Sequence, residues 1–141
     1  MNLVIDTNIF IAALLKDSKI RELIVNSHCN LLVPELIYQE IEEHKEELIN
    51  KSGLSEEEFN NLISLLNKYL TIIPNEKLAN YQKEAETIIG AIDKDDIPIM
   101  AASLSNNNCP IWSDDFHLQK QKTIKVFTTK QRNQGGSRLA G

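Results

Sequence analysis

The chain has 141 residues, of which 42% are hydrophobic and 25% are charged, and its net charge is −5. These values are typical of one folded domain that buries its own core, and they exclude a disulfide-stapled miniprotein. Because neither a membrane-span pattern nor a signal peptide is present, we expect a cytoplasmic protein that makes no membrane contact. The acidic balance counts mildly against a broad basic surface for nucleic acid, but it does not exclude a nuclease, because a metal site needs acids.

Short apolar segments predict strands, and helical patterns lie between them. The predicted strands are residues 3–5, 30–33, 110–112 and 125–127, with a weaker one at 72–74. The predicted helices are residues 9–26, 34–50, 55–69, 78–92 and 98–106. This alternation predicts an α/β fold with a mostly parallel sheet covered on both faces. The three helical patterns between the second and third clear strands predict an inserted helical subdomain.

Several residues mark where these elements begin or end. Ser55, followed three residues later by Glu58, forms a capping-box pattern. Gly53 suits the end of the helix before it, and Pro34 suits the first turn of a helix.

The cysteines and the end of the chain show no catalytic or ligand-binding pattern. Cys29 and Cys109 each lie beside a predicted strand, so we expect buried thiols rather than a disulfide or a ligand pair. Residues 132–141 lack an apolar pattern. We therefore divide the chain into a domain of residues 1–129 and a tail of residues 130–141 that is disordered or was added by cloning.

The first strand ends in an acid, because Asp6 follows the apolar residues 3–5 and precedes Thr7 and Asn8. The carboxyl ends of strands in open parallel sheets carry the ligand sites of such folds. Asp6 therefore either caps the following helix or belongs to a ligand site. The choice depends on whether other carboxylates return to the same edge.

One acid of the helix predicted at 34–50 points inward. At about 100° per residue, Glu40 falls within the apolar sector of this helix. That sector consists of Leu36, Ile37, Ile41 and Leu48. A carboxylate turned toward a core is costly unless it is paired or bound to a cation. Glu40 is therefore a candidate ligand, and the alternatives are a buried salt bridge or a side chain that reaches water.

Acids are crowded ahead of the helix predicted at 98–106, where Asp93, Asp95 and Asp96 lie within four residues. One acid at a helix start is explained by capping. Three exceed that need, and like charges this close repel unless something positive lies among them.

The strand predicted at 110–112 repeats the pattern of the first strand, because Ser113, Asp114 and Asp115 follow it directly. The same residues also suit a turn. Taken with the earlier acids, they favour a shared site.

Strand ends and helix starts share an edge in a parallel sheet, so Asp6, Glu40, Asp96 and either Asp114 or Asp115 are expected to converge. Carboxylates without neighbouring Lys or Arg favour a hard cation, Mg²⁺ or Mn²⁺, which activates water and clamps a phosphodiester. Zinc is disfavoured because the cysteines and histidines show no ligand spacing, and the sequence holds no phosphate-binding glycine loop.

The chain resembles a PIN domain over about residues 1–129. The resemblance rests on four motifs in the family's order: VIDTNIF with Asp6, PELIYQEIEEH with Glu40, DKDDIPIMAASL with Asp96, and WSDDFHL. It implies a three-layer α/β/α fold with a mostly parallel sheet of four or five strands. It also implies an acidic pocket that binds one or two Mg²⁺ or Mn²⁺ ions.

The family's last motif distinguishes between the two adjacent acids. There a Ser or Thr is followed two residues later by the acid and then, three residues further on, by an apolar residue. Ser113, Asp115 and Leu118 match this spacing, so the resemblance favours Asp115 over Asp114. The implied catalytic and metal-binding acids are Asp6, Glu40, Asp96 and Asp115, with Asp93 and Asp114 nearby and with Thr7, Asn8 and Ser113 as supporting polar groups.

The resemblance implies a metal-dependent endoribonuclease that hydrolyses RNA phosphodiester bonds by metal-activated water. Compact stand-alone PIN domains are similar to the toxins of type II toxin–antitoxin pairs, which implies an RNA substrate, an antitoxin partner and a homodimer. The alternatives are a housekeeping RNA-processing nuclease and a non-catalytic PIN module that binds RNA or protein. Five lysines could contact RNA phosphates or form ordinary solvated surface, namely Lys16, Lys45, Lys120, Lys122 and Lys125.

Overall fold

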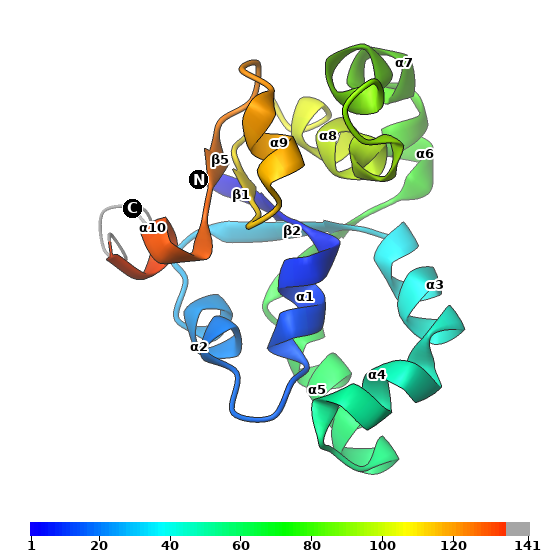
Figure 1. Ribbon diagram of the computed structural model, residues 1–141, viewed down its shortest axis with the longest axis vertical. Coiled ribbons are helices and arrows are strands. Elements are labelled where there is room, and N and C mark those ends of the chain that lie inside the picture. Colours follow the sequence, from blue (N-terminus) through cyan, green and yellow to red (C-terminus); the bar gives the residue numbers. More distant parts are fainter. Residues whose placement is uncertain (135–141) are drawn as a thin grey trace.

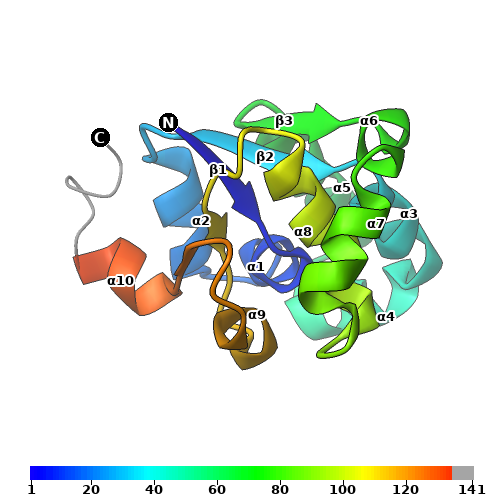
Figure 2. The same ribbon diagram turned by 90° about the horizontal axis from the view of Figure 1, so that it is seen from above.

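The protein, described over residues 1–134 by a computed structural model, has three layers (Figures 1 and 2). Its centre is a five-stranded sheet in the order β3-β2-β1-β4-β5, and all neighbouring strands are parallel. The strands are β1 (Asn2–Ile5), β2 (Asn30–Pro34), β3 (Leu70–Ile73), β4 (Ile111–Trp112) and β5 (Val126–Phe127). The predicted α/β class and parallel sheet are confirmed.

Helices cover both faces of this sheet. The helices of the described residues are α1 (Thr7–Ala13), α2 (Lys19–Val25), α3 (Leu36–Glu43), α4 (Lys45–Ser52), α5 (Glu56–Asn67), α6 (Asn75–Ala79), α7 (Gln82–Ala85), α8 (Ile97–Leu104), α9 (Phe116–Lys120) and α10 (Thr129–Gln134). A π-helical turn spans Glu86–Gly90 and a 3-10 turn spans Lys94–Asp96. None of the helices within residues 1–134 is long and apolar enough to cross a membrane.

Two hydrophobic clusters hold the layers together, one on each face of the sheet. Leu3 and Ile5 of β1 pack with residues of α1, α2, α3 and α5, while Val4 packs with residues of α6, α7, α8 and α9. Side chains alternate between faces along a strand, so a central strand covered on both sides is apolar throughout. The apolar run of β1 stops at Asp6, and this places the first carboxylate at the carboxyl edge of the sheet.

The two long helices predicted at 9–26 and 34–50 are each broken. Asp17 adopts a left-handed backbone (φ 57°), and the Ser18 side chain then caps α2 by accepting a hydrogen bond from the Arg21 amide. Pro34 is the last residue of β2 and not part of a helix, and His44 lies between α3 and α4. The apolar period continues across both breaks, which is why the pattern alone predicted single helices.

The prediction of an inserted helical subdomain is wrong. Residues 70–73 form β3, which pairs with β2 over four residues, so this segment is a full member of the sheet. The helices before and after β3 are therefore crossover connections of the sheet. The helix predicted at 78–92 is divided into α6, α7 and the π-helical turn.

Local capping signals were predicted correctly at α5. Ser55 and Glu58 form a capping box, with the Ser55 hydroxyl accepting from the Glu58 amide at 3.1 Å and the Glu58 carboxylate accepting from the Ser55 amide at 3.0 Å. Gly53 ends α4 with a left-handed φ of 75°, which favours glycine. Cys29 and Cys109 are both buried, as predicted.

Helix α10 crosses the boundary predicted at residue 129. Arg132 of this helix is buried, its guanidinium lies 5.5 Å from the centre of the Trp112 ring, and it donates to the Ser27 hydroxyl at 3.1 Å. The helix therefore packs on the core next to β4. The tail prediction for residues 135–141 lies outside the described residues.

Candidate functional site

Asp6 lies at the end of β1, and its carboxylate is directed to β4. Its side chain makes no capping hydrogen bond to α1; instead, Asp6 Oδ2 accepts a hydrogen bond from Ser113 Oγ at 2.7 Å. Only 4% of Asp6 is exposed, and Ser113 is fully buried. Burial raises the pKa of Asp6, and the hydrogen bond from Ser113 opposes this rise. Two roles were predicted for Asp6, and its side chain does not perform the capping role.

Ser113 also fixes Asp115, because its hydroxyl oxygen accepts from the Asp115 amide at 2.9 Å. Asp115 is the N-cap of α9, where its Oδ1 accepts from the His117 amide at 2.9 Å. The same oxygen lies 3.1 Å from His117 Nδ1. One hydroxyl thus sets the positions of the acids that follow β1 and β4.

Asp114 and Asp115 differ in their hydrogen-bond partners. Asp114 accepts from the Thr129 amide at 2.7 Å and from Thr129 Oγ1 at 2.5 Å, so it holds the first turn of α10. After burial, which is the larger cause, the charge of Asp115 raises the pKa of both Asp6 and Asp96, whereas the charge of Asp114 adds less to the pKa of Asp6 alone. Asp115 is therefore the better placed of the two to hold a cation.

Asp96 lies where the 3-10 turn meets α8, and only 6% of it is exposed. Its Oδ2 is buried and has no hydrogen-bond partner within the described part of the chain. Burial, followed by the charges of Asp115, Asp6 and Asp93, raises the pKa of Asp96 to about 8. A buried carboxylate oxygen without a donor is costly, and a bound cation would remove this cost.

Asp93 and His117 complete the cluster on its outer side. Asp93 Oδ1 caps the 3-10 turn by accepting from the Asp95 amide at 3.0 Å, while its Oδ2 lies 3.6 Å from His117 Nδ1. One ligand atom each of Asp93, Asp115 and His117 lies within 4.8 Å of the other two. The sequence pattern did not predict His117 as a site residue, because its spacing from the other histidines and the cysteines is not that of zinc ligands. Its position two residues after Asp115 on the same helix start is the signal that places it here.

Glu40 stands at the edge of this arrangement. It is half-buried on α3, and burial is the main cause of its raised pKa. The charges of Asp95 and Glu43 add to that rise, and the charge of Asp6 contributes less than either. Glu40 lines a shallow hollow together with Asn8.

Thr7 and Asn8 lie in the first turn of α1, where Thr7 is half-buried and Asn8 is exposed. The structure therefore brings Asp6, Asp96, Asp115 and Ser113 together and leaves Glu40 and Asn8 at the periphery. The supporting roles of Thr7 and Asn8 stay predictions.

The charge balance of the site fits a divalent cation. Within residues 1–134, no lysine or arginine forms an ion pair with Asp6, Asp96 or Asp115, and the basic group next to the acids is the imidazole of His117. Oxygen ligands at this density are the donors that Mg²⁺ and Mn²⁺ prefer, and an added imidazole nitrogen is compatible with Mn²⁺. The residues present therefore suit such an ion.

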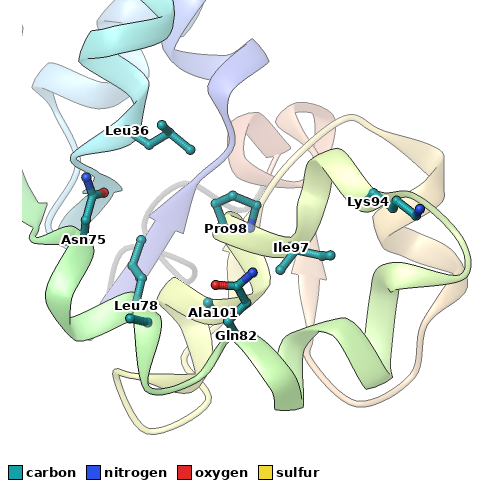
Figure 3. Close-up of a pocket in the computed structure, with 9 residues that line it drawn as sticks. Leu36, Asn75, Leu78, Gln82, Lys94, Ile97, Pro98 and Ala101 are labelled. Atoms are coloured by element: carbon teal, nitrogen blue, oxygen red, sulfur yellow. The ribbon is translucent and has the colours of Figure 1, made fainter.

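A separate hollow lies between α3, α6 and α8 (Figure 3). Leu36 and Leu78 face Ile97 and Pro98 across it, and the Lys94 side chain lies at its outer end. None of the site carboxylates lines this hollow. The groups that could perform chemistry are therefore at the carboxyl edge of the sheet and not in this apolar depression.

Comparisons with known proteins agree with this geometry. The family profile described as PIN domain matches residues 4–133. The structure is similar to the crystal structure of VapBC2 from Rickettsia felis bound to a DNA fragment from their promoter, with a TM-score of 0.65 and 17% sequence identity. That alignment covers 91% of this chain and 98% of the other, and at this identity it shows a shared fold. No curated protein sequence matched the chain.

Proposed function

The chain belongs to the PIN-domain family, and on this premise we propose that its acidic site hydrolyses RNA phosphodiester bonds in the presence of Mg²⁺ or Mn²⁺. The observation that carries the proposal is the environment of Asp96. Its carboxylate is buried, one oxygen has no donor, and the charges of Asp6 and Asp115 surround it. A bound cation would neutralise this repulsion, and a cluster of oxygen donors fits such an ion.

In this proposal Asp6, Asp96 and Asp115 bind the cation, and Glu40 contributes from the periphery through water. A bound divalent cation lowers the pKa of water and neutralises charge that develops on the phosphodiester. Ser113 holds the Asp6 carboxylate and the Asp115 backbone amide through its two hydrogen bonds, and the His117 amide holds the Asp115 carboxylate. Ligands held in this way require little reorganisation during the reaction.

Glu40 has a further role in the proposed reaction. Burial brings its pKa closer to neutrality, and this suits a side chain that accepts a proton from the attacking water. Its half-exposed position beside Asn8 leaves it open to solvent on one side. The proton can therefore leave the site through Glu40 without crossing the core.

We further propose that the protein is the toxin of a toxin–antitoxin pair. The support is the shared fold with the VapBC2 structure, which covers nearly the whole of both chains. An antitoxin would be a small protein that covers the acidic edge and excludes RNA. Expression of this chain alone is expected to slow growth, and co-expression of the short reading frame encoded next to it is expected to restore growth.

The activity is tested with labelled RNA incubated with the purified protein in Mg²⁺, in Mn²⁺ and in chelator. Cleavage is expected in either metal and is expected to vanish in chelator and in the Asp6→Asn variant. Asp17→Asn is the matched control, because Asp17 is exposed and asparagine tolerates its left-handed backbone. Cleavage that persists in chelator or in Asp6→Asn would contradict the proposal. Binding of RNA without any cleavage would instead identify a non-catalytic module.

A further inference from the structure

Phe116 is exposed at a position where folding does not require an aromatic side chain. Its side chain is 59% exposed, the largest fraction among the exposed large apolar residues of the described chain. The neighbouring Leu118 is fully buried and anchors α9 to the core. Single exposed apolar residues are common, so exposure alone does not indicate a binding site. What distinguishes Phe116 is its position beside the acids.

The Phe116 ring lies beside the acidic site. Phe116 directly follows Asp115, and its ring packs against the His117 imidazole with centroids 4.2 Å apart and planes 31° apart. The imidazole is in turn placed by Asp115 and Asp93, at 3.1 Å and 3.6 Å from its Nδ1. The ring therefore lies next to the proposed reaction centre, in contact with an imidazole that two of the acids place.

Lys120 adds a positive charge next to this ring. Its Nζ lies 4.8 Å from the centre of the Phe116 ring, one helical turn further along α9. An exposed cation–π contact changes an equilibrium by only about 2- to 5-fold. Stacking of a nucleobase on an aromatic ring changes binding by about 5- to 150-fold, so a base outcompetes the ammonium for the ring. The displaced ammonium is then free to pair with a phosphate.

The acidic rim of the site favours contacts with RNA that do not depend on positive charge. Asp95 and Asp114 are exposed near the site, so the rim repels a polyanion. Contacts that do not depend on a basic surface would therefore add to the affinity for RNA at this rim. Stacking is one of these, since it is independent of the backbone charge.

We propose that Phe116 and Lys120 form a base-binding subsite for single-stranded RNA. An unpaired base stacks on the Phe116 ring, Lys120 pairs with its phosphate, and the adjoining phosphodiester reaches the acids. This inference rests on the proposed ribonuclease function. It restricts the substrate to unpaired segments, because a base within a duplex does not present its face, and it leaves the base identity open.

The test measures the dissociation constant of a labelled single-stranded RNA of about 12 nucleotides by fluorescence anisotropy. The Asp6→Asn protein is used with Mn²⁺, so that binding is observed without cleavage. Adding Phe116→Ala is expected to weaken binding about 10-fold, and adding Phe116→Trp is expected to restore it. Tyr69→Ala is the matched control, because Tyr69 is 41% exposed but precedes β3 at the opposite edge of the sheet.

A second oligomer identifies the contact as stacking. It has the same phosphates but abasic riboses, so the effect of Phe116→Ala should fall to about 1-fold on it. Equal losses on both oligomers, or no loss on the RNA, would overturn the proposal. It would also be overturned if Phe116→Ala abolished antitoxin binding and left RNA binding unchanged. Because cleavage by the unsubstituted protein is assayed separately, a failed subsite is distinguishable from a failed nuclease.

Discussion

Ser113 Oγ donates to Asp6 Oδ2 at 2.7 Å, and this hydrogen bond joins side chains 107 residues apart in the sequence. The same hydroxyl oxygen accepts from the Asp115 amide at 2.9 Å. The ends of β1 and β4 are already adjacent in the sheet, where the Asp6 amide donates to the Trp112 carbonyl at 3.0 Å. Ser113 therefore links the Asp6 carboxylate at the end of β1 to the Asp115 backbone after β4.

Replacing Ser113 with alanine removes both hydrogen bonds at once. We expect the free energy of unfolding to fall by about 1–3 kcal/mol, because the Asp115 amide loses its acceptor in a buried site. We also expect cleavage to fall about 10-fold or more, since the two acids lose their common support. Urea titration and initial rates measure the two effects. Ser105→Ala is the control, because that hydroxyl donates to the Ala102 carbonyl. A loss of stability without a loss of rate would show that Ser113 does not position the acids.

Replacing Asp96 with asparagine should separate stability from activity. Asparagine has the same shape, carries no charge and can donate to Asp115, so the repulsion of residue 96 by Asp115, Asp6 and Asp93 disappears. We expect the Tm in chelator at pH 8 to rise by several degrees, because about 1 kcal/mol shifts the Tm of a domain of this size by about 3–5 °C. Cleavage should be lost. Asp17→Asn, which changes an exposed acid that no shifted pKa in the site depends on, is expected to move neither quantity.

The pH dependence of stability should also originate at Asp96. In the cation-free folded protein its pKa is raised to about 8, while the unfolded chain has a value of 3.8. Between these two values the unfolded chain has released this proton and the folded protein retains it. The contribution of Asp96 to the free energy of unfolding is therefore full at low pH and is lost as the pH rises to about 8.

The measurement is the Tm of the unsubstituted protein minus that of Asp96→Asn, in chelator, at a series of pH values. We expect this difference to become steadily more negative from about pH 4 and to level off above about pH 8. Saturating Mn²⁺ should reverse the trend, because a cation favours the ionised carboxylate. A difference that does not change with pH would show that Asp96 ionises normally.

Asp114 and Asp115 should respond in opposite ways to substitution. Asp114 holds the α10 start through the amide and hydroxyl of Thr129. Asp114→Ala should therefore lower the free energy of unfolding by about 1–2 kcal/mol and leave most of the activity. Asp115→Asn keeps a side-chain oxygen for the α9 cap but removes the charge, so it should abolish cleavage at little cost in stability. Parallel urea titrations and cleavage assays distinguish the two adjacent acids.

The acids of the site could be predicted because their positions depend on topology. A carboxylate that ends a buried strand must lie at the sheet edge, and this holds for both Asp6 and Asp115. Asp96 follows the same logic at a helix start. Helical period predicted an inward Glu40, and the structure leaves this residue half-buried, because the period gives direction and not distance. The structure leaves Glu40 at the periphery for this reason.

Other features could not be predicted from the sequence pattern, because they depend on partners that are distant in the chain. His117 gains its role only when the 3-10 turn brings Asp93 to 3.6 Å from its ring. Helix α10 lacks an apolar stripe, yet Arg132 is buried over the Trp112 ring. The breaks at Asp17 and His44 interrupt helices whose apolar period continues, so no hydrophobic pattern marks them.

Trp112 is the one tryptophan of the sequence, and it lies immediately before Ser113. Its ring is fully buried under the Arg132 guanidinium, and its Nε1 donates to Thr129 Oγ1 at 3.1 Å. Thr129 in turn donates to Asp114. The molecule therefore carries a built-in fluorophore whose surroundings include both the C-terminal helix and the strand that leads into the acids. Its emission colour and lifetime would report detachment of α10 or rearrangement of this strand in real time, with no dye attached.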